Sequence, residues 1–94
     1  MPLLVVTGAS RGIGRAIAER GLERGLPVCA IARDGDALAT LGPPDRVEVG
    51  VADVRDAAAV RAAVDAAVAR FGPPTLVVAA AGLLGPIDRP WRLD

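Results

Sequence analysis

The sequence lacks the side chains that most often carry proton chemistry in enzymes. Its 94 residues contain no lysine, histidine or tyrosine, and Ser10 is its one serine. The absence of lysine excludes a P-loop nucleotide site, because that motif needs a lysine to reach the β- and γ-phosphates. Acidic residues, arginines and Cys29 are the remaining titratable side chains. They offer few means of positioning a proton donor for general acid–base catalysis.

Other scarcities narrow the class of protein further. A single cysteine excludes an internal disulfide, and the apolar run around Cys29 is typical of a buried structural thiol. Eleven arginines balance eleven acidic residues, which leaves no charge pattern suited to nucleic acid or an anionic membrane. No apolar run approaches the ~20 residues that span a bilayer, and no signal peptide is recognisable. We expect a cytoplasmic protein.

Small apolar residues dominate what is present. Hydrophobic residues make up 52% of the chain and aromatic residues 2%, so the core must be built from small side chains. A chain of this length forms one small domain at most. Pro86 and Pro90 forbid a regular helix near the end, and we expect residues 81–94 to be mostly irregular.

Short apolar runs alternate with helical patterns along the chain. This alternation predicts an α/β fold with a parallel, doubly wound sheet and right-handed crossovers. We expect strands at Leu3–Thr7, Val28–Ala32, Val47–Val51 and 75–80, and helices at 12–24, 36–41 and Ala57–Phe71.

Polar and apolar positions predict how these helices begin and which face they bury. Asp34 or Asp36 is suited to cap the second helix, and Asp56 the third. In the third helix, four apolar residues form a stripe toward the sheet: Val60, Val64, Val68 and Phe71. In the first helix, we expect the following to face the sheet: Ile13, Ile17 and either Ala16 or Ala18. Its outward residues should be Arg15, Glu19 and Glu23.

The octet Thr7-Gly8-Ala9-Ser10-Arg11-Gly12-Ile13-Gly14 joins the first strand to the first helix. Glycines let a backbone turn tightly and approach a diphosphate with no Cβ in the way. The N–H groups at the start of the helix then face the anion. The alternative is a turn that serves only to pack the helix on the strand. The candidate binding residues are Gly8, Ser10, Arg11, Gly12, Ile13 and Gly14.

The glycine spacing, G-x-x-x-G-x-G, resembles that of the classical short-chain dehydrogenase/reductase (SDR) family. Residues 7–14 match its motif T-G-x-x-x-G-I-G in full. The resemblance implies a Rossmann-like sheet, here truncated after about four strands in the order 3-2-1-4. It also implies a nicotinamide dinucleotide as ligand and an oxidoreductase that interconverts an alcohol and a carbonyl by hydride transfer. Residues 1–94 would form a partial NAD(P)-binding domain.

The end of the second strand bears on the choice of coenzyme. An acid about 20 residues beyond the glycine motif binds the adenosine ribose, whereas an arginine accommodates a 2′-phosphate. Ala32 and Arg33 occupy this place, and Arg11 could reach the same phosphate. Two converging arginines favour NADP over NAD. Two alternatives remain open: Arg33 is a solvated surface charge, or Asp34 contacts the ribose.

Two further segments resemble SDR landmarks. Asp53 and Val54 match an Asp-Val pair that holds adenine in the family, although an aspartate there is also typical of a turn or helix cap. Residues 79–82 resemble the segment N-N-A-G, with alanine at both asparagine positions. Ala80, Ala81 and Gly82 are therefore candidate neighbours of the coenzyme.

The family's catalytic tyrosine, lysine and serine have no counterpart in these 94 residues. We therefore assign no catalytic residue and no metal ligand, and expect the chain to be inactive alone. It resembles the N-terminal part of an SDR. The alternatives are a non-catalytic nucleotide-binding or partner protein, and a structural remnant. In the order 3-2-1-4 the fourth strand lies at an edge, and its unpaired backbone predicts self-association.

Overall fold

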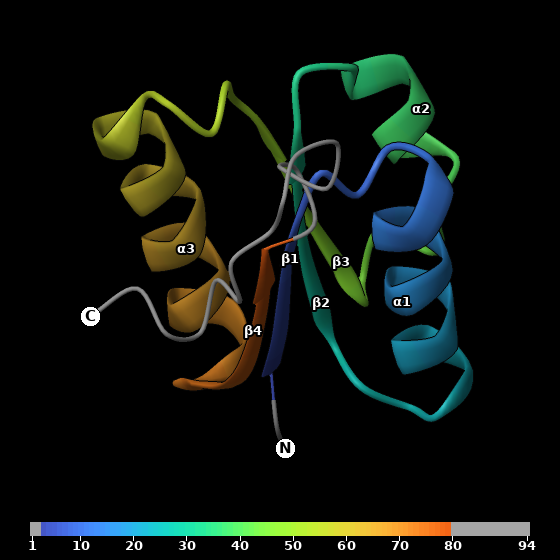
Figure 1. Cartoon of the computed structure of the whole chain (residues 1–94). Helices are drawn as coiled ribbons and strands as arrows, with labels where there is room; N and C mark the ends of the chain where they lie inside the picture. Colours follow the sequence, from blue (N-terminus) through green and yellow to red (C-terminus); the bar gives the residue numbers. More distant parts are fainter. Residues whose placement is uncertain (1–2, 80–94) are drawn as a thin grey trace.

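The computed structural model describes residues 3–79, which fold into alternating strands and helices (Figure 1). The strands lie in the order β3-β2-β1-β4, and all neighbouring pairs are parallel. The predicted fold class and strand order are therefore confirmed. The strands are β1 (Leu3–Thr7), β2 (Val28–Ala32), β3 (Val47–Val51) and β4 (Pro74–Ala79); the helices are α1 (Gly12–Glu23), α2 (Gly35–Ala39) and α3 (Ala57–Phe71).

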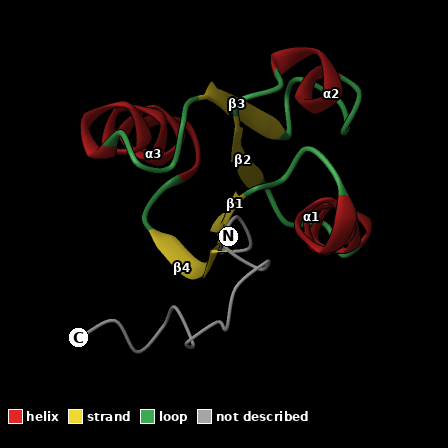
Figure 2. Cartoon of the chain, turned by 45° about the horizontal axis from the view of Figure 1, so that its top comes forward, coloured by secondary structure: helices red, strands yellow, loops and turns green. Residues whose placement is uncertain are grey.

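Helices cover both faces of the sheet, α1 and α2 on one side and α3 on the other (Figure 2). Successive side chains of a strand point to opposite faces, so β1 and β2 feed two separate clusters. Leu4 and Val6 belong to the cluster under α1 and α2, whereas Leu3 and Val5 belong to the one under α3. All five residues of β2 are buried, as expected of a central parallel strand.

Helix α3 sits directly on the sheet. Its predicted apolar stripe packs against the cluster that contains Cys29, and Ala67 is fully buried there. A Cβ added at Gly50 in β3 would lie 2.5 Å from the Cβ of Ala63. The absence of a side chain at this position is what lets helix and strand come so close.

Aspartates start two of the helices. Asp34, not Asp36, caps α2: its Oδ1 accepts from the Ala37 N–H at 3.0 Å. Asp56 caps α3 as predicted, through the Ala59 N–H at 3.1 Å. Helix α1 ends at Glu23, one residue earlier than predicted, and α2 runs from Gly35 to Ala39 instead of 36–41.

Among the described strands, β4 forms one edge of the sheet, beside β1. Leu76 and Val77 are 55% and 59% exposed, respectively. The candidate residues Ala80, Ala81 and Gly82 and the tail predicted to be irregular lie outside the described residues. Within residues 3–79, no helix has the length and apolar character needed to cross a bilayer.

Candidate functional site

A pocket of about 1060 Å³ lies at the carboxyl edge of the sheet, where ligands bind in open parallel α/β folds. Three connections line it: those that follow β1, β2 and β3. The parallel arrangement brings them together although they are far apart in sequence. The lining residues are Gly8, Ser10, Arg11, Gly12, Ile13, Gly14, Ala32, Arg33, Asp34, Ala37, Ala52, Asp53, Val54 and Arg55.

The first wall is the glycine loop after β1. Gly8 and Gly12 have φ angles of 67° and 64°, a region that other residues rarely adopt. Apart from its chain neighbours and the nearby backbone of its own helix, nothing lies within 4 Å of the place where a Cβ at Gly12 would stand. The N-cap residue of α1, Arg11, makes no side-chain capping bond, so the first amides of this helix keep their hydrogen-bonding capacity. The loop is thus an open backbone surface at a positive helix end.

Ile13 corrects one prediction about α1. It does not face the sheet; it is 61% exposed and lines the pocket. The buried residues Gly14, Ala18 and Gly21 are spaced by four and three, which defines the stripe that packs on the strands. Ile13 precedes Gly14 and so points about 100° away from that stripe. Ile17 packs against the core as predicted.

The second wall follows β2. The Arg33 side chain is 77% exposed at the pocket, and its Nη1 lies 4.0 Å from Oδ2 of Asp53. Arg11 lines the same pocket. Asp34, the alternative ribose contact, uses Oδ1 to cap α2. The connection therefore presents Arg33 as its exposed charge, while the carboxylate beside it is held by helix capping.

The third wall centres on Asp53, with Val54 beside it 43% exposed. Arg55 donates to Oδ1 from its backbone N–H at 2.9 Å and from Nε at 3.2 Å, and to Oδ2 from Nη2 at 2.8 Å. These bonds hold the pKa of Asp53 well below its usual range, and the carboxylate raises the pKa of Arg55. The Asp53 carboxylate is therefore ionised throughout the physiological pH range and faces two guanidinium groups.

Arg55 is a pocket residue that the sequence reasoning missed. The available signal was the spacing Asp-x-Arg in a turn, which lets the arginine bond back to the aspartate two residues earlier. Asp53 does not cap α3, since Asp56 holds that place. Its backbone does shape the turn, because its carbonyl accepts from the Asp56 N–H at 2.8 Å.

Comparison with known proteins gives the family. Residues 2–90 match the model for short chain dehydrogenase. The chain is 43% identical over 84 residues to D-threitol dehydrogenase of Mycolicibacterium smegmatis, which covers 84% of this chain and 32% of that protein. It is 35% identical over 89 residues to 2-dehydro-3-deoxy-L-rhamnonate dehydrogenase (NAD(+)) of a Sphingomonas species, covering 94% and 36%. The chain thus spans about a third of the length of the curated relatives it matches.

Solved structures agree with the sequence matches. The KRED1-Pglu enzyme superposes with a TM-score of 0.82 at 37% identity, covering all of this chain and 41% of that one. An actinorhodin polyketide ketoreductase with NADPH gives a TM-score of 0.75 at 35% identity, covering 86% and 33%. The glycine loop, the parallel sheet and these matches lead to one conclusion: the chain belongs to the short-chain dehydrogenase family.

Proposed function

We propose that the pocket binds a nicotinamide dinucleotide, NADP in preference to NAD, and that residues 1–94 are the partial coenzyme-binding domain of an SDR oxidoreductase. The observation that carries this proposal is the glycine loop. Its two positive φ angles and the open space at Gly12 leave room for a diphosphate at the start of α1. Such a coenzyme supplies the hydride for interconverting an alcohol and a carbonyl.

Each wall of the pocket has a proposed role toward this ligand. The amides of the loop, with Ser10, hold the diphosphate, and Ile13 adds an apolar contact. Val54 packs against the adenine ring, and Asp53 accepts from its amine while keeping its bonds to Arg55. Ala80, Ala81 and Gly82 remain predicted neighbours of the nicotinamide ribose.

The preference for NADP follows from the charges. Arg33 and Arg11 line one pocket, and two guanidinium groups favour a dianionic phosphate over a hydroxyl. Relatives point to both coenzymes, since one is named for NAD(+) and a solved ketoreductase holds NADPH. The support for NADP therefore comes from the two arginines of this chain's own pocket.

Titration of the chain with NADPH and NADH tests the coenzyme. Arg33→Ala should weaken NADPH binding by about tenfold and leave NADH within about twofold, because one charge-assisted contact is lost. Arg61→Ala is the matched control, since Arg61 is exposed on α3 and outside the residues that line the pocket. Equal affinities of the unaltered chain for both coenzymes would contradict the preference for NADP.

A glycine pair tests the diphosphate position. Gly12 and Gly72 both have positive φ angles and open space around a Cβ, but Gly72 lies at the C-cap of α3. Valine at either position strains the backbone, and Gly72 is a demanding control because its φ of 94° and ψ of −178° are almost exclusive to glycine. Gly12→Val should abolish coenzyme binding, whereas Gly72→Val should leave it unchanged. Binding that survives in Gly12→Val shows that the ligand does not approach this loop.

The chain itself should bind without turnover. It has no tyrosine, lysine or histidine to place a proton donor at the developing alkoxide. Incubation of the NADPH-bound chain with ketones and aldehydes should therefore give no coenzyme oxidation. Oxidation that depends on the added carbonyl would overturn this part of the proposal.

A further inference from the structure

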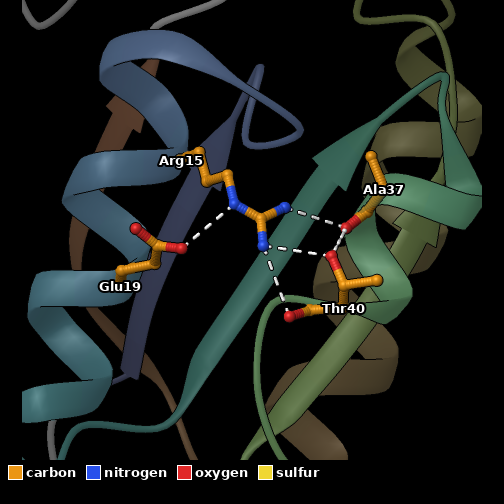
Figure 3. A network of polar contacts seen from close by, with 4 residues as sticks. All are labelled: Arg15, Glu19, Ala37 and Thr40. Atoms are coloured by element: carbon orange, nitrogen blue, oxygen red, sulfur yellow. Dashed lines mark hydrogen bonds and ion pairs between the residues drawn. The ribbon is translucent and has the colours of Figure 1, made fainter.

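Arg15 connects the glycine loop to the short helix that follows β2. It comes directly after Gly14, and its guanidinium group crosses from α1 to α2 (Figure 3). Nη1 donates to the carbonyl of Ala37 at 2.9 Å, and Nη2 donates to Oγ1 and the carbonyl of Thr40 at 3.0 and 3.3 Å. Nε pairs with Glu19 at 3.0 Å. The sequence predicted an outward-facing side chain, but Arg15 reaches across to α2 and is 25% exposed.

These contacts hold the end of a helix that is too short to be stable alone. Helix α2 has five residues, and isolated helices of this length do not form in water. Asp34 caps its beginning and Leu38 is its buried anchor. At its other end, the Ala37 carbonyl accepts from the Thr40 N–H and hydroxyl, and Arg15 adds a further donor to it and one to the Thr40 carbonyl. Its positive charge also lies at the negative pole of the helix.

The same helix carries part of the pocket wall. Ala37 lines the pocket with its neighbours Arg33 and Asp34, and its carbonyl is one of the two that Arg15 binds. Arg15 itself is outside the residues that line the pocket. Its guanidinium therefore ties the wall bearing Arg33 to the helix that begins at the glycine loop.

We propose that Arg15 is a positioning residue: it fixes Arg33 relative to the glycine loop and so sets how strongly the pocket distinguishes a 2′-phosphate from a 2′-hydroxyl on the adenosine ribose. This inference rests on the proposed function. Arg15 would thus affect the choice of coenzyme without contacting the coenzyme itself. Loss of the guanidinium lets α2 shift, which moves Arg33 while the diphosphate contacts of the loop remain.

The ratio of the affinities for two adenosine ligands tests this role, because general destabilisation should weaken both affinities equally. Adenosine 2′,5′-bisphosphate carries the extra phosphate, and adenosine 5′-monophosphate does not. Calorimetric titration of the 94-residue chain with each gives a selectivity ratio. Arg15→Leu should reduce this ratio by about tenfold, the loss of about one charge-assisted contact. Arg15→Lys should restore part of it, since one ammonium reaches fewer carbonyls than a planar guanidinium.

Control variants separate the loss of the bonds between Arg15 and α2 from the general effect of removing an arginine from α1. Arg20→Leu makes the same change on α1 at a residue whose ion partner is Glu23 on the same helix, and it should leave the ratio unchanged. Thr40→Val removes one acceptor of Arg15 together with the hydroxyl's own bond to the Ala37 carbonyl, and it should lower the ratio by about twofold. Hydrogen exchange at the Leu38 and Leu41 amides should be faster in Arg15→Leu, because α2 is less well held.

The outcomes are distinguishable. A ratio that stays at the value of the unaltered chain in folded Arg15→Leu overturns this inference alone. If that variant does not fold, an unchanged ratio in Thr40→Val overturns it instead. If the unaltered chain shows no preference for the bisphosphate, the proposed NADP preference fails, and the role of Arg15 fails with it.

Discussion

Strands β1 and β4 are neighbours with nearly the same apolar character and opposite surroundings. Leu4 pairs with Leu76, and Val5 pairs with Val77. The two residues of β1 are 3% and 2% exposed, whereas their partners in β4 are 55% and 59% exposed. Strand β1 lies between two strands and under helices on both faces; β4 has β1 as its sole strand neighbour within the described residues. Apolar sequence therefore selects a strand, but its neighbours decide whether that strand is buried.

Within residues 3–79, β4 is the more exposed of the two strands, and association would begin there. An edge strand with exposed apolar side chains offers unpaired backbone groups to another chain. The chain spans about a third of its curated relatives. Self-association through β4 therefore stays a prediction. Two pairs of substitutions test the contrast between β1 and β4, and two further tests concern the buried strands β3 and β2.

A charged pair should give the largest difference. Val5→Lys places an unpaired charge between β1 and α3 and should cost about 4 kcal/mol or more, enough to unfold the chain. Val77→Lys should cost about 1 kcal/mol or less and should shift the chain toward monomer. Urea unfolding measures the first effect and sedimentation the second. A chain that is already monomeric at all concentrations contradicts the association.

The leucine pair tests packing without charge. Leu4→Ala should lower the free energy of unfolding by about 2–5 kcal/mol, because a cavity is left in the core. Leu76→Ala should lower it by about 1 kcal/mol or less, since that side chain is more than half exposed. Equal losses would show that another chain or segment covers β4 in solution.

Adding one methyl group tests how tightly β3 packs against α3. Gly50→Ala puts a methyl group against the Cβ of Ala63 and near Ile31, and should cost about 1–3 kcal/mol. Ala79→Val on β4 adds volume at an exposed position and should stay within about 0.5 kcal/mol. Thermal unfolding of both variants checks the contrast. A neutral Gly50→Ala would mean that α3 can move away from β3.

Cys29 gives an effect that is confined to alkaline pH. Burial and the nearby Glu48 raise the pKa of its thiol from 9.0 to about 12. Above pH 9 the unfolded chain loses this proton and the folded chain keeps it, so stability falls as pH rises from 9 to 12. The slope is about 1.4 kcal/mol per pH unit. With no lysine or tyrosine to titrate there, Cys29→Ala should flatten the profile.

The sequence predicted most of the fold because its signals are local. The bounds of β1, β2, β3 and α3 are as predicted, since short apolar runs are separated by turn residues and Asp56 caps the last helix. The capping role of Asp34 needed the structure, because Asp36 was an equal alternative from sequence.

What the sequence could not predict depends on distant partners or on helix rotation. Arg15 binds carbonyls 22 and 25 residues away, and no local pattern indicates that contact. Ile13 was placed by hydrophobicity, but the small residues Gly14, Ala18 and Gly21 define the buried stripe. The pair of Asp53 and Arg55 is local, yet its geometry depends on the turn that follows β3.

The contact of Gly50 with Ala63 makes the residue types in β3 and α3 depend on each other. Strand β3 and helix α3 lie so close at this point that the Cβ of Ala63 occupies the space that a Cβ at residue 50 would need. A strand grafted here from a relative with a larger residue at position 50 would have no space under the present helix. Recombination between family members should therefore exchange this strand and its crossover helix as a single module.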